Sequence, residues 1–280
     1  MTATIVVCGA GTMGRGIALV GALSGFHTVL FDLDANALRM SMEYARQRLA
    51  RDSGGRPAEE VLSSINPTTD IHACIGDIVI EAIAEDVGLK ADLFNRLAEI
   101  NHSDTVFATN TSSLSVSDIA EKVQHPERVC GMHFFNPAPA MRLVEVVRGR
   151  STHPDVVEAV MELSRRMGKT PVLCSDSPGF IVNRVARPYY LESLRMLESG
   201  ASDIATTDAL MESCGFRMGP FRLMDLIGND INYAVSSSLY ESLGRPDRLK
   251  PSPIQKDKVG KGELGRKTGK GYYGYPATQS

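Results

Sequence analysis

The sequence predicts an α/β fold, a doubly wound and mainly parallel sheet, followed by an all-α C-terminal domain. In the first part of the chain, short β-branched runs alternate with amphipathic helical stretches. This alternation is typical of a parallel sheet that is covered by helices on both faces. After the segment SDSPGF at 175–180, the strand pattern ends and only helical periodicity remains.

The individual elements follow from local signals. A helix is expected over 153–169, because proline opens its apolar stripe and basic residues and Gly168 close it. The Pro-Gly turn before residue 180 predicts a boundary between a domain at 1–180 and a helical domain at 181–280. Apolar runs predict strands at 3–9, 27–33, 77–83, 105–110, 128–135, 143–149 and 170–176.

Composition narrows the classes of function. The 280 residues carry a formal net charge of −3, so no basic field is available to attract nucleic acid or an anionic membrane surface. Neither a leader nor an apolar run of the ~18 residues that a membrane span requires is visible, so we expect a cytoplasmic protein. The five cysteines form no CxxC pair and are interpreted as reduced, buried thiols, with no metal site.

The segment GAGTMG, residues 9–14, fits the pattern G-x-G-x-x-G between a strand and a helix. Its glycines allow a tight turn and a close approach of a pyrophosphate to the helix N-terminus. The next strand ends in Asp32, which can bind the ribose hydroxyls of an adenosine and would repel a 2′-phosphate. The sequence therefore predicts a Rossmann-type domain that binds NAD through Gly9, Gly11, Thr12, Met13, Gly14 and Asp32.

One histidine and one glutamate stand at the two ends of the apolar segment HFFNPAPAMRLVE, residues 133–145. If NPAPA is a turn between two strands, His133 and Glu145 face one another. A carboxylate on one imidazole nitrogen fixes the tautomer and leaves the other nitrogen as a base. A dehydrogenase needs such a base for the hydroxyl proton; the alternative is a histidine satisfied within the core.

Other polar residues lie where ligands of doubly wound sheets bind. In ATNTSS, residues 108–113, Asn110 and Ser112 are candidate ligand-binding residues, although Ser112 and Ser113 are equally explained as caps of the next helix. Asn183 interrupts an apolar helical start, with a solvated helix surface as the alternative. The segment GRKTGKGYYGY lacks the spacing of a phosphate-binding loop and is interpreted as a tail folded against the body.

Together these segments resemble the short-chain L-3-hydroxyacyl-CoA dehydrogenase family, which includes the 3-hydroxybutyryl-CoA dehydrogenases. The resemblance extends over nearly the whole chain and rests on segments in family order and spacing. These segments are GAGTMGRGIA, EAIAEDVGLKADLF, ATNTSSLS, GMHFFNPAPAMRLVEVV, DSPGFIVNR, MGPFRLMDLIGND and LGRKTGKGYYGY.

The resemblance implies roles for particular residues. His133 would take the proton of the 3-hydroxyl group of an acyl-CoA substrate, and Glu145 would orient it. Ser112, Asn136 and Asn183 would line the pocket around the reacting oxygen and the thioester. Glu85, Lys90 and Asn110 would lie on the cofactor side, Glu85 and Lys90 along the nicotinamide half. The helical domain would close the cleft and form a homodimer.

The sequence departs from the family pattern in two places. The stretch RQRLARDSGGRPAEEVL, 46–62, has arginines and glycines where relatives carry lysines that hold the CoA phosphates, and PAPAMRLVE has alanines in place of valines, which would widen the pocket. These departures leave open a relative that acts on a free hydroxy acid of the L-gulonate or carnitine type. A non-catalytic, crystallin-like dinucleotide-binding protein is the alternative from another class.

Overall fold

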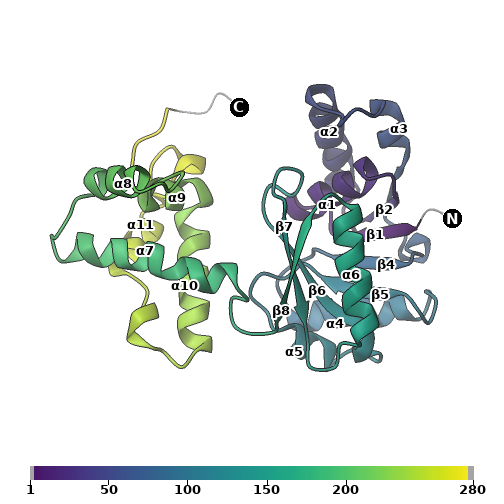
Figure 1. Cartoon of the computed structure of the whole chain (residues 1–280). Helices are drawn as coiled ribbons and strands as arrows, with labels where there is room; N and C mark the ends of the chain where they lie inside the picture. Colours follow the sequence, from purple (N-terminus) through teal and green to yellow (C-terminus); the bar gives the residue numbers. More distant parts are fainter. Residues whose placement is uncertain (1–2, 277–280) are drawn as a thin grey trace. The chain divides into compact units, whose positions relative to one another are not determined.

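The computed structural model describes residues 3–276, and within them the chain divides between Phe180 and Ile181 into two compact units (Figure 1). In the described part of the first unit, eight strands form one sheet in the order β3-β2-β1-β4-β5-β6-β7-β8. All neighbours pair in parallel except β6 and β7, so the predicted fold class is confirmed. The strands are β1 (Thr4–Cys8), β2 (His27–Phe31), β3 (Ile65–Thr68), β4 (Ile78–Glu81), β5 (Val106–Thr109), β6 (Val129–Phe134), β7 (Leu143–Arg148) and β8 (Thr170–Ser175).

Strand β3 was not predicted from the sequence. Its four residues, INPT, carry an asparagine and a proline, which weaken any strand pattern. The strand lies at the edge of the sheet and pairs only with β2 among the described residues. A proline is tolerated at such an edge because its missing N–H would have faced away from the sheet.

Helices cover both faces of the sheet. Ile5 and Val7 of β1 belong to a core cluster with α1, α2 and α6, whereas Val6 and Cys8 belong to a second cluster with α4 and α5. This division follows from the alternation of side chains along a strand. The helices of this unit are α1 (Thr12–Leu23), α2 (Ala35–Arg51), α3 (Ala58–Ser63), α4 (Val87–Ala98), α5 (Val116–Ala120) and α6 (Pro154–Arg166), with 3₁₀ turns η1 (Ile71–Ala73) and η2 (Pro126–Arg128).

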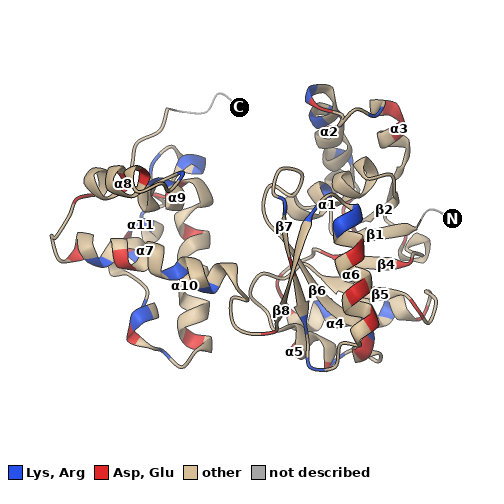
Figure 2. Ribbon diagram, in the orientation of Figure 1, with Lys and Arg blue, Asp and Glu red and all other residues tan. Residues whose placement is uncertain are grey.

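The second unit is helical, as predicted. Its helices are α7 (Val182–Glu198), α8 (Ile204–Ser213), α9 (Pro220–Ile227), α10 (Asn229–Ser242) and α11 (Pro253–Gly260), with η3 (Asp247–Leu249) and η4 (Arg266–Thr268). Across residues 3–276, none of the helices combines the length and the apolar character that crossing a membrane would demand. Figure 2 shows charged residues along helices of both units, for example α2, α6 and α7.

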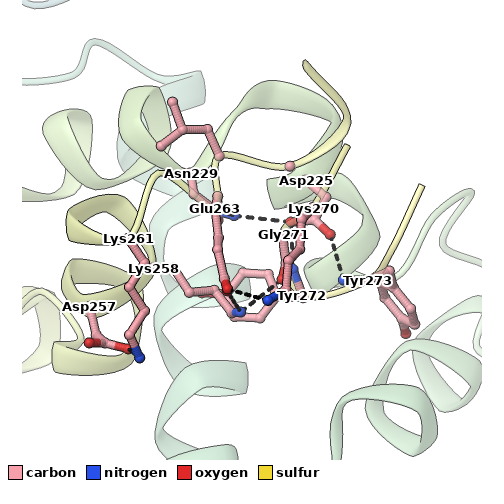
Figure 3. A network of polar contacts seen from close by, with 12 residues as sticks. Asp225, Asn229, Asp257, Lys258, Lys261, Glu263, Lys270, Gly271, Tyr272 and Tyr273 are labelled. Atoms are coloured by element: carbon pink, nitrogen blue, oxygen red, sulfur yellow. Dashed lines mark hydrogen bonds and ion pairs between the residues drawn. The ribbon is translucent and has the colours of Figure 1, made fainter. Parts of the chain in front are cut away.

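The glycine-rich tail folds against this helical unit, as the sequence indicated. The buried carboxylate of Asp225 on α9 accepts hydrogen bonds from the backbone N–H of Tyr272 and of Tyr273, both at 2.9 Å (Figure 3). The hydroxyl of Tyr275 donates to the same carboxylate at 3.0 Å. A Cβ at Gly271 would lie 1.9 Å from Asp225 Oδ1. Glycine is therefore required at 271 because the carboxylate comes so close to the tail backbone.

All five cysteines are thiols, but the expectation that all of them are buried is wrong for one. Cys8, Cys74, Cys130 and Cys174 are buried, whereas Cys214 is exposed. Cys214 caps the end of α8 at the surface of the helical unit. Burial raises the pKa of the Cys130 thiol to about 12, so this side chain behaves as a small apolar residue.

Candidate active site

Two glycines of the turn have no space for a side chain, whereas the third does. Gly9 has φ +102°, and a Cβ there would lie 2.6 Å from the carbonyl oxygen of Ala82; a Cβ at Gly14 would lie 1.6 Å from the carbonyl oxygen of Gly9. At Gly11 a Cβ would meet nothing within 4 Å. Gly11 is the N-cap of α1, with no side-chain cap for the helix N–H groups. An open, uncapped helix N-terminus of this kind fits a pyrophosphate.

The other residues predicted to bind NAD differ in their exposure and contacts. Thr12 is exposed beside Gly11, whereas Met13 is half-buried and packs against the core. Asp32 does more than the sequence indicated: its Oδ2 accepts from the N–H of Ala10 at 2.6 Å and its Oδ1 from the N–H of Asp34 at 2.9 Å. The carboxylate that is predicted to bind ribose therefore also braces the glycine turn.

A buried ion pair lies at the end of β4. Glu81 is 0% exposed, and its Oε1 is 2.6 Å from Nζ of Lys90 and accepts from the N–H of Ile83 at 2.7 Å. The hydroxyl of Thr109, at the end of β5, donates to Oε2 of Glu81 at 2.8 Å. Burial raises the pKa of Glu81, and the charge of Lys90 opposes that rise. Sequence reasoning missed Glu81, although one carboxylate within the apolar run IVIEAI was a signal.

Lys90 connects this carboxylate to a second one. The side chain of Lys90 is 1% exposed, and its Nζ lies 3.0 Å from Oε2 of Glu85. Burial works to raise the pKa of Glu85, but the Lys90 charge and hydrogen bonds outweigh it, so that this pKa is lowered. The ammonium group is therefore held between two carboxylates.

Glu85 in turn holds the loop that contains the candidate serines. Its Oε1 accepts from the hydroxyl of Thr111 at 2.6 Å, from the N–H of Ser112 at 3.1 Å and from the hydroxyl of Ser113 at 3.2 Å. The alternative that Ser112 and Ser113 cap the next helix is wrong. Helix α5 begins at Val116, and Ser115 is its N-cap.

Asn110 joins two strand ends. Its backbone N–H donates to the carbonyl oxygen of Glu81 at 2.8 Å, and its Oδ1 accepts from the N–H of Phe134 at 2.9 Å. Phe134 follows His133 directly in β6. The side chain of Asn110 therefore ties the end of β5 to the strand that carries the candidate base.

His133 and Glu145 face one another across the antiparallel pair β6–β7, as predicted. They are partners in the register of the two strands, and Nδ1 of His133 is 2.8 Å from Oε2 of Glu145. Their side chains are 7% and 1% exposed. The rings of Phe135 and Phe180 lie 4.6 Å and 5.8 Å from the imidazole, between centroids. An apolar wall and a buried carboxylate strengthen the electrostatic coupling between the two groups.

The turn between these strands is fixed by a lysine. Nζ of Lys169 donates to the carbonyl oxygens of Ala138 at 2.6 Å and of Met141 at 2.9 Å. Ala138 is buried, and a Cβ at Gly16 of α1 would lie 3.2 Å from its methyl group. The small side chain at 138 is thus explained by packing against α1. Asn136 lies exposed at the start of the same turn.

Asn183 belongs to the second unit. It lies half-buried in the first turn of α7, and its carbonyl oxygen accepts from Nε of Arg187 at 3.0 Å. Arg187 is 3% exposed and also donates to the carbonyl oxygen of Asn232 and the hydroxyl of Ser236. The start of α7 is therefore anchored to α10.

Comparison with protein families finds two matches that together cover most of the chain. Residues 4–177 match the family described as 3-hydroxyacyl-CoA dehydrogenase, NAD binding domain. Residues 179–275 match the family described as 3-hydroxyacyl-CoA dehydrogenase, C-terminal domain.

The known proteins that are similar to this chain in sequence and structure include dehydrogenases of 3-hydroxyacyl-CoA esters. A 3-hydroxyadipyl-CoA dehydrogenase of Escherichia coli is 46% identical over 98% of this chain, which spans only 59% of that protein. A probable 3-hydroxybutyryl-CoA dehydrogenase of Bacillus subtilis is 40% identical over 97% of this chain and 96% of its own length. The crystal structure of the (S)-3-hydroxybutyryl-CoA dehydrogenase of Ralstonia eutropha has a TM-score of 0.93 and 34% identity, and covers 99% of this chain and 100% of its own.

Proposed function

Because the chain belongs to the 3-hydroxyacyl-CoA dehydrogenase family, we propose that it oxidises a short-chain L-3-hydroxyacyl-CoA of the 3-hydroxybutyryl type to the 3-oxoacyl-CoA and catalyses the reverse reaction. The family match also confirms the predicted NAD-binding domain and the resemblance stated from the sequence. NAD, when bound, supplies the hydride acceptor for this reaction.

The observation that carries the proposal is the buried pair of His133 and Glu145. Since Glu145 engages Nδ1 at 2.8 Å, Nε2 is the nitrogen that takes the proton of the 3-hydroxyl group. The carboxylate fixes the tautomer and stabilises the imidazolium that forms. In the reverse direction the same imidazolium returns the proton to the 3-oxo group.

On the cofactor side, the uncapped start of α1 at Gly11 would hold the pyrophosphate, with Thr12 and Met13 following it. Asp32 would hold the adenosine ribose. Glu85, Lys90 and Asn110 would lie along the nicotinamide half, since they gather at the ends of β4 and β5. These residues fit a dinucleotide laid across the ends of the parallel strands.

On the substrate side, Ser112, Asn136 and Asn183 would surround the reacting oxygen and the thioester of the acyl-CoA. The helical unit would provide the homodimer contact, and the protein would work in the cytoplasm. The name of the Escherichia coli relative favours a second substrate, an acyl chain that ends in a distal carboxylate. A 3-hydroxyadipyl-CoA therefore belongs beside 3-hydroxybutyryl-CoA in any test.

The decisive experiment measures NADH oxidation by the purified protein with acetoacetyl-CoA and with 3-oxoadipyl-CoA. NADPH and free acetoacetate serve as the controls for cofactor and carrier. We expect turnover only with NADH and a CoA ester, and the ratio of the two kcat/KM values will identify the preferred acyl chain. Turnover of free acetoacetate but of neither CoA ester would instead support a free hydroxy acid as substrate. Binding of NADH without any turnover would support a non-catalytic protein.

A further inference from the structure

The Glu81 triad, which comprises Glu81, Lys90 and Glu85, carries more negative than positive charge. Two carboxylates share one ammonium group, at 2.6 Å and 3.0 Å from its nitrogen. Glu81 and Lys90 are 0% and 1% exposed in their side chains, so water screens this pair little. Without Glu81, the charges of Lys90 and Glu85 would cancel; with it, the site keeps one excess negative charge.

The triad lies directly beside the glycine turn. The N–H of Ala82, next to Glu81, donates to the carbonyl oxygen of Cys8 at 2.7 Å. The carbonyl oxygen of Ala82 is the atom that a Cβ at Gly9 would strike. The triad is therefore located at the end of β4, where the strand order reverses across β1. Ligands of doubly wound sheets bind at this switch point.

The orientation of the cofactor relative to the triad follows from the position of Asp32. This orientation rests on the proposed function, in which Asp32 binds the adenosine ribose. Asp32 follows β2 on one side of β1, and Glu81 ends β4 on the other side. A dinucleotide with its adenosine ribose on Asp32 and its pyrophosphate on Gly11 would extend towards the ends of β4 and β5 with its other half. That half carries the nicotinamide ring.

The two redox forms of the cofactor differ in charge at this ring, which is positive in NAD⁺ and neutral in NADH. A negative charge near the ring would attract the positive form more strongly than the neutral form, so it would change the relative affinity of the two. We propose that the Glu81 triad favours the oxidised cofactor through its one excess negative charge, to which Glu81 contributes the most deeply buried carboxylate.

Glu81→Gln is a variant that removes the charge and keeps the contacts. Oε1 of Glu81 already accepts from both Lys90 and Ile83, so the amide oxygen of glutamine can replace it. In the wild type, the hydroxyl of Thr109 donates to Oε2 of Glu81. In the variant, the amide nitrogen takes the place of Oε2 and donates to this hydroxyl instead. The side-chain shape and the contacts with Lys90 and Ile83 are retained, and the contact with Thr109 is reversed in direction. A purely structural role of Glu81 therefore predicts little change in the ratio of the two cofactor affinities.

Glu263→Gln provides the matched control. Glu263 is also a mostly buried carboxylate with two lysines, since its oxygens lie 2.9 Å from Nζ of Lys258 and 2.5 Å from Nζ of Lys270 (Figure 3). It belongs to the helical unit. This variant changes the net charge of the protein by the same amount, outside the proposed cofactor site.

The test measures the dissociation constants of NAD⁺, by calorimetry, and of NADH, by fluorescence, in the full chain without substrate. In Glu81→Gln we expect the ratio Kd(NAD⁺)/Kd(NADH) to rise about tenfold, the order expected for one unit charge in a partly solvated site. The ratio should stay at the wild-type value in Glu263→Gln. Thermal unfolding of each variant verifies that it is folded.

An unchanged ratio in folded Glu81→Gln overturns the proposal, and so does an equal rise in Glu263→Gln. If Glu81→Gln does not fold, Glu85→Gln removes the same charge from a side chain that is 39% exposed, and its ratio must rise in the same direction. Failure of the wild-type protein to bind either form would refute the proposed function itself. Binding of both forms with no shift of the ratio would refute only the role of the triad.

Discussion

Glu145 is the register partner of His133 in the antiparallel pair β6–β7, and its Oε2 lies 2.8 Å from Nδ1 of that histidine. Side chains alternate along a strand, so a slip of one residue would turn the carboxylate to the opposite face of the sheet. The hairpin turn, held by Lys169 through two carbonyl oxygens, therefore decides whether the pair can form.

Removal of either member of the pair should stop the chemistry and spare the cofactor site. We expect His133→Ala to lower kcat by about 10² to 10⁴, the usual contribution of a general base. Glu145→Gln should also lower kcat, because the imidazolium loses its stabilising charge. NADH affinity, measured by fluorescence, should change less than about twofold in both. His125→Ala, which alters an exposed histidine, is the control, and near-wild-type turnover of His133→Ala would contradict the mechanism.

Replacing glycine by alanine at two positions of the glycine turn should affect different properties, cofactor binding at Gly11 and stability at Gly14. Gly11→Ala should leave the free energy of unfolding within about 1 kcal/mol, because its Cβ meets no protein atom and its φ of −68° suits any residue. It should weaken NADH binding at least about tenfold, since the methyl group would occupy the place that we propose for the pyrophosphate. Gly14→Ala should instead destabilise the protein by about 3 kcal/mol, because of the clash with the Gly9 carbonyl oxygen. Urea unfolding and NADH titration measure both effects; tight NADH binding by Gly11→Ala would be inconsistent with this site.

The helical unit should depend on one buried carboxylate. Asp225→Ala leaves the N–H groups of Tyr272 and Tyr273 without their acceptor, at about 1–3 kcal/mol for each buried group. We expect the free energy of unfolding to fall by about 2–4 kcal/mol in urea unfolding followed by circular dichroism. Asp257→Ala, which removes an exposed carboxylate paired with Lys261, should change it by less than about 1 kcal/mol. Equal losses in the two variants would argue against Asp225 as the anchor of the tail.

Acid should weaken the ion pairs of Glu263. Hydrogen bonds from Lys270 and Lys258 lower the pKa of Glu263 from 4.5 to about 2. A carboxylate with a depressed folded-state pKa contributes stability above its unfolded pKa, and this contribution is lost as the pH falls from 4.5 towards 2. The melting temperature of the wild type should therefore fall more between pH 6 and pH 3 than that of Glu263→Gln. Parallel pH profiles of the two proteins would show that this carboxylate has no part in acid stability.

The sequence alone determined the features that depend on neighbours along the chain. The glycine turn, Asp32, helix α6 and the helical character of residues beyond 180 were all predicted, because local spacing encodes turns, caps and periodicity. The facing of His133 and Glu145 was also predicted, since a short turn between two strands suffices to bring them together.

Only the tertiary structure decided the features that depend on distant segments. Strand β3 has almost no strand pattern and forms because β2 offers it an open edge. In the sequence, Glu81 is a single polar residue in an apolar strand. In the structure, Lys90, nine positions further on, and Thr109 of β5 contact its carboxylate. Glu85 holds the Thr111–Ser113 loop, a contact that no local pattern announces. A buried charge acquires its role from the partners that the fold brings to it, and those partners are set by the order of strands in the sheet.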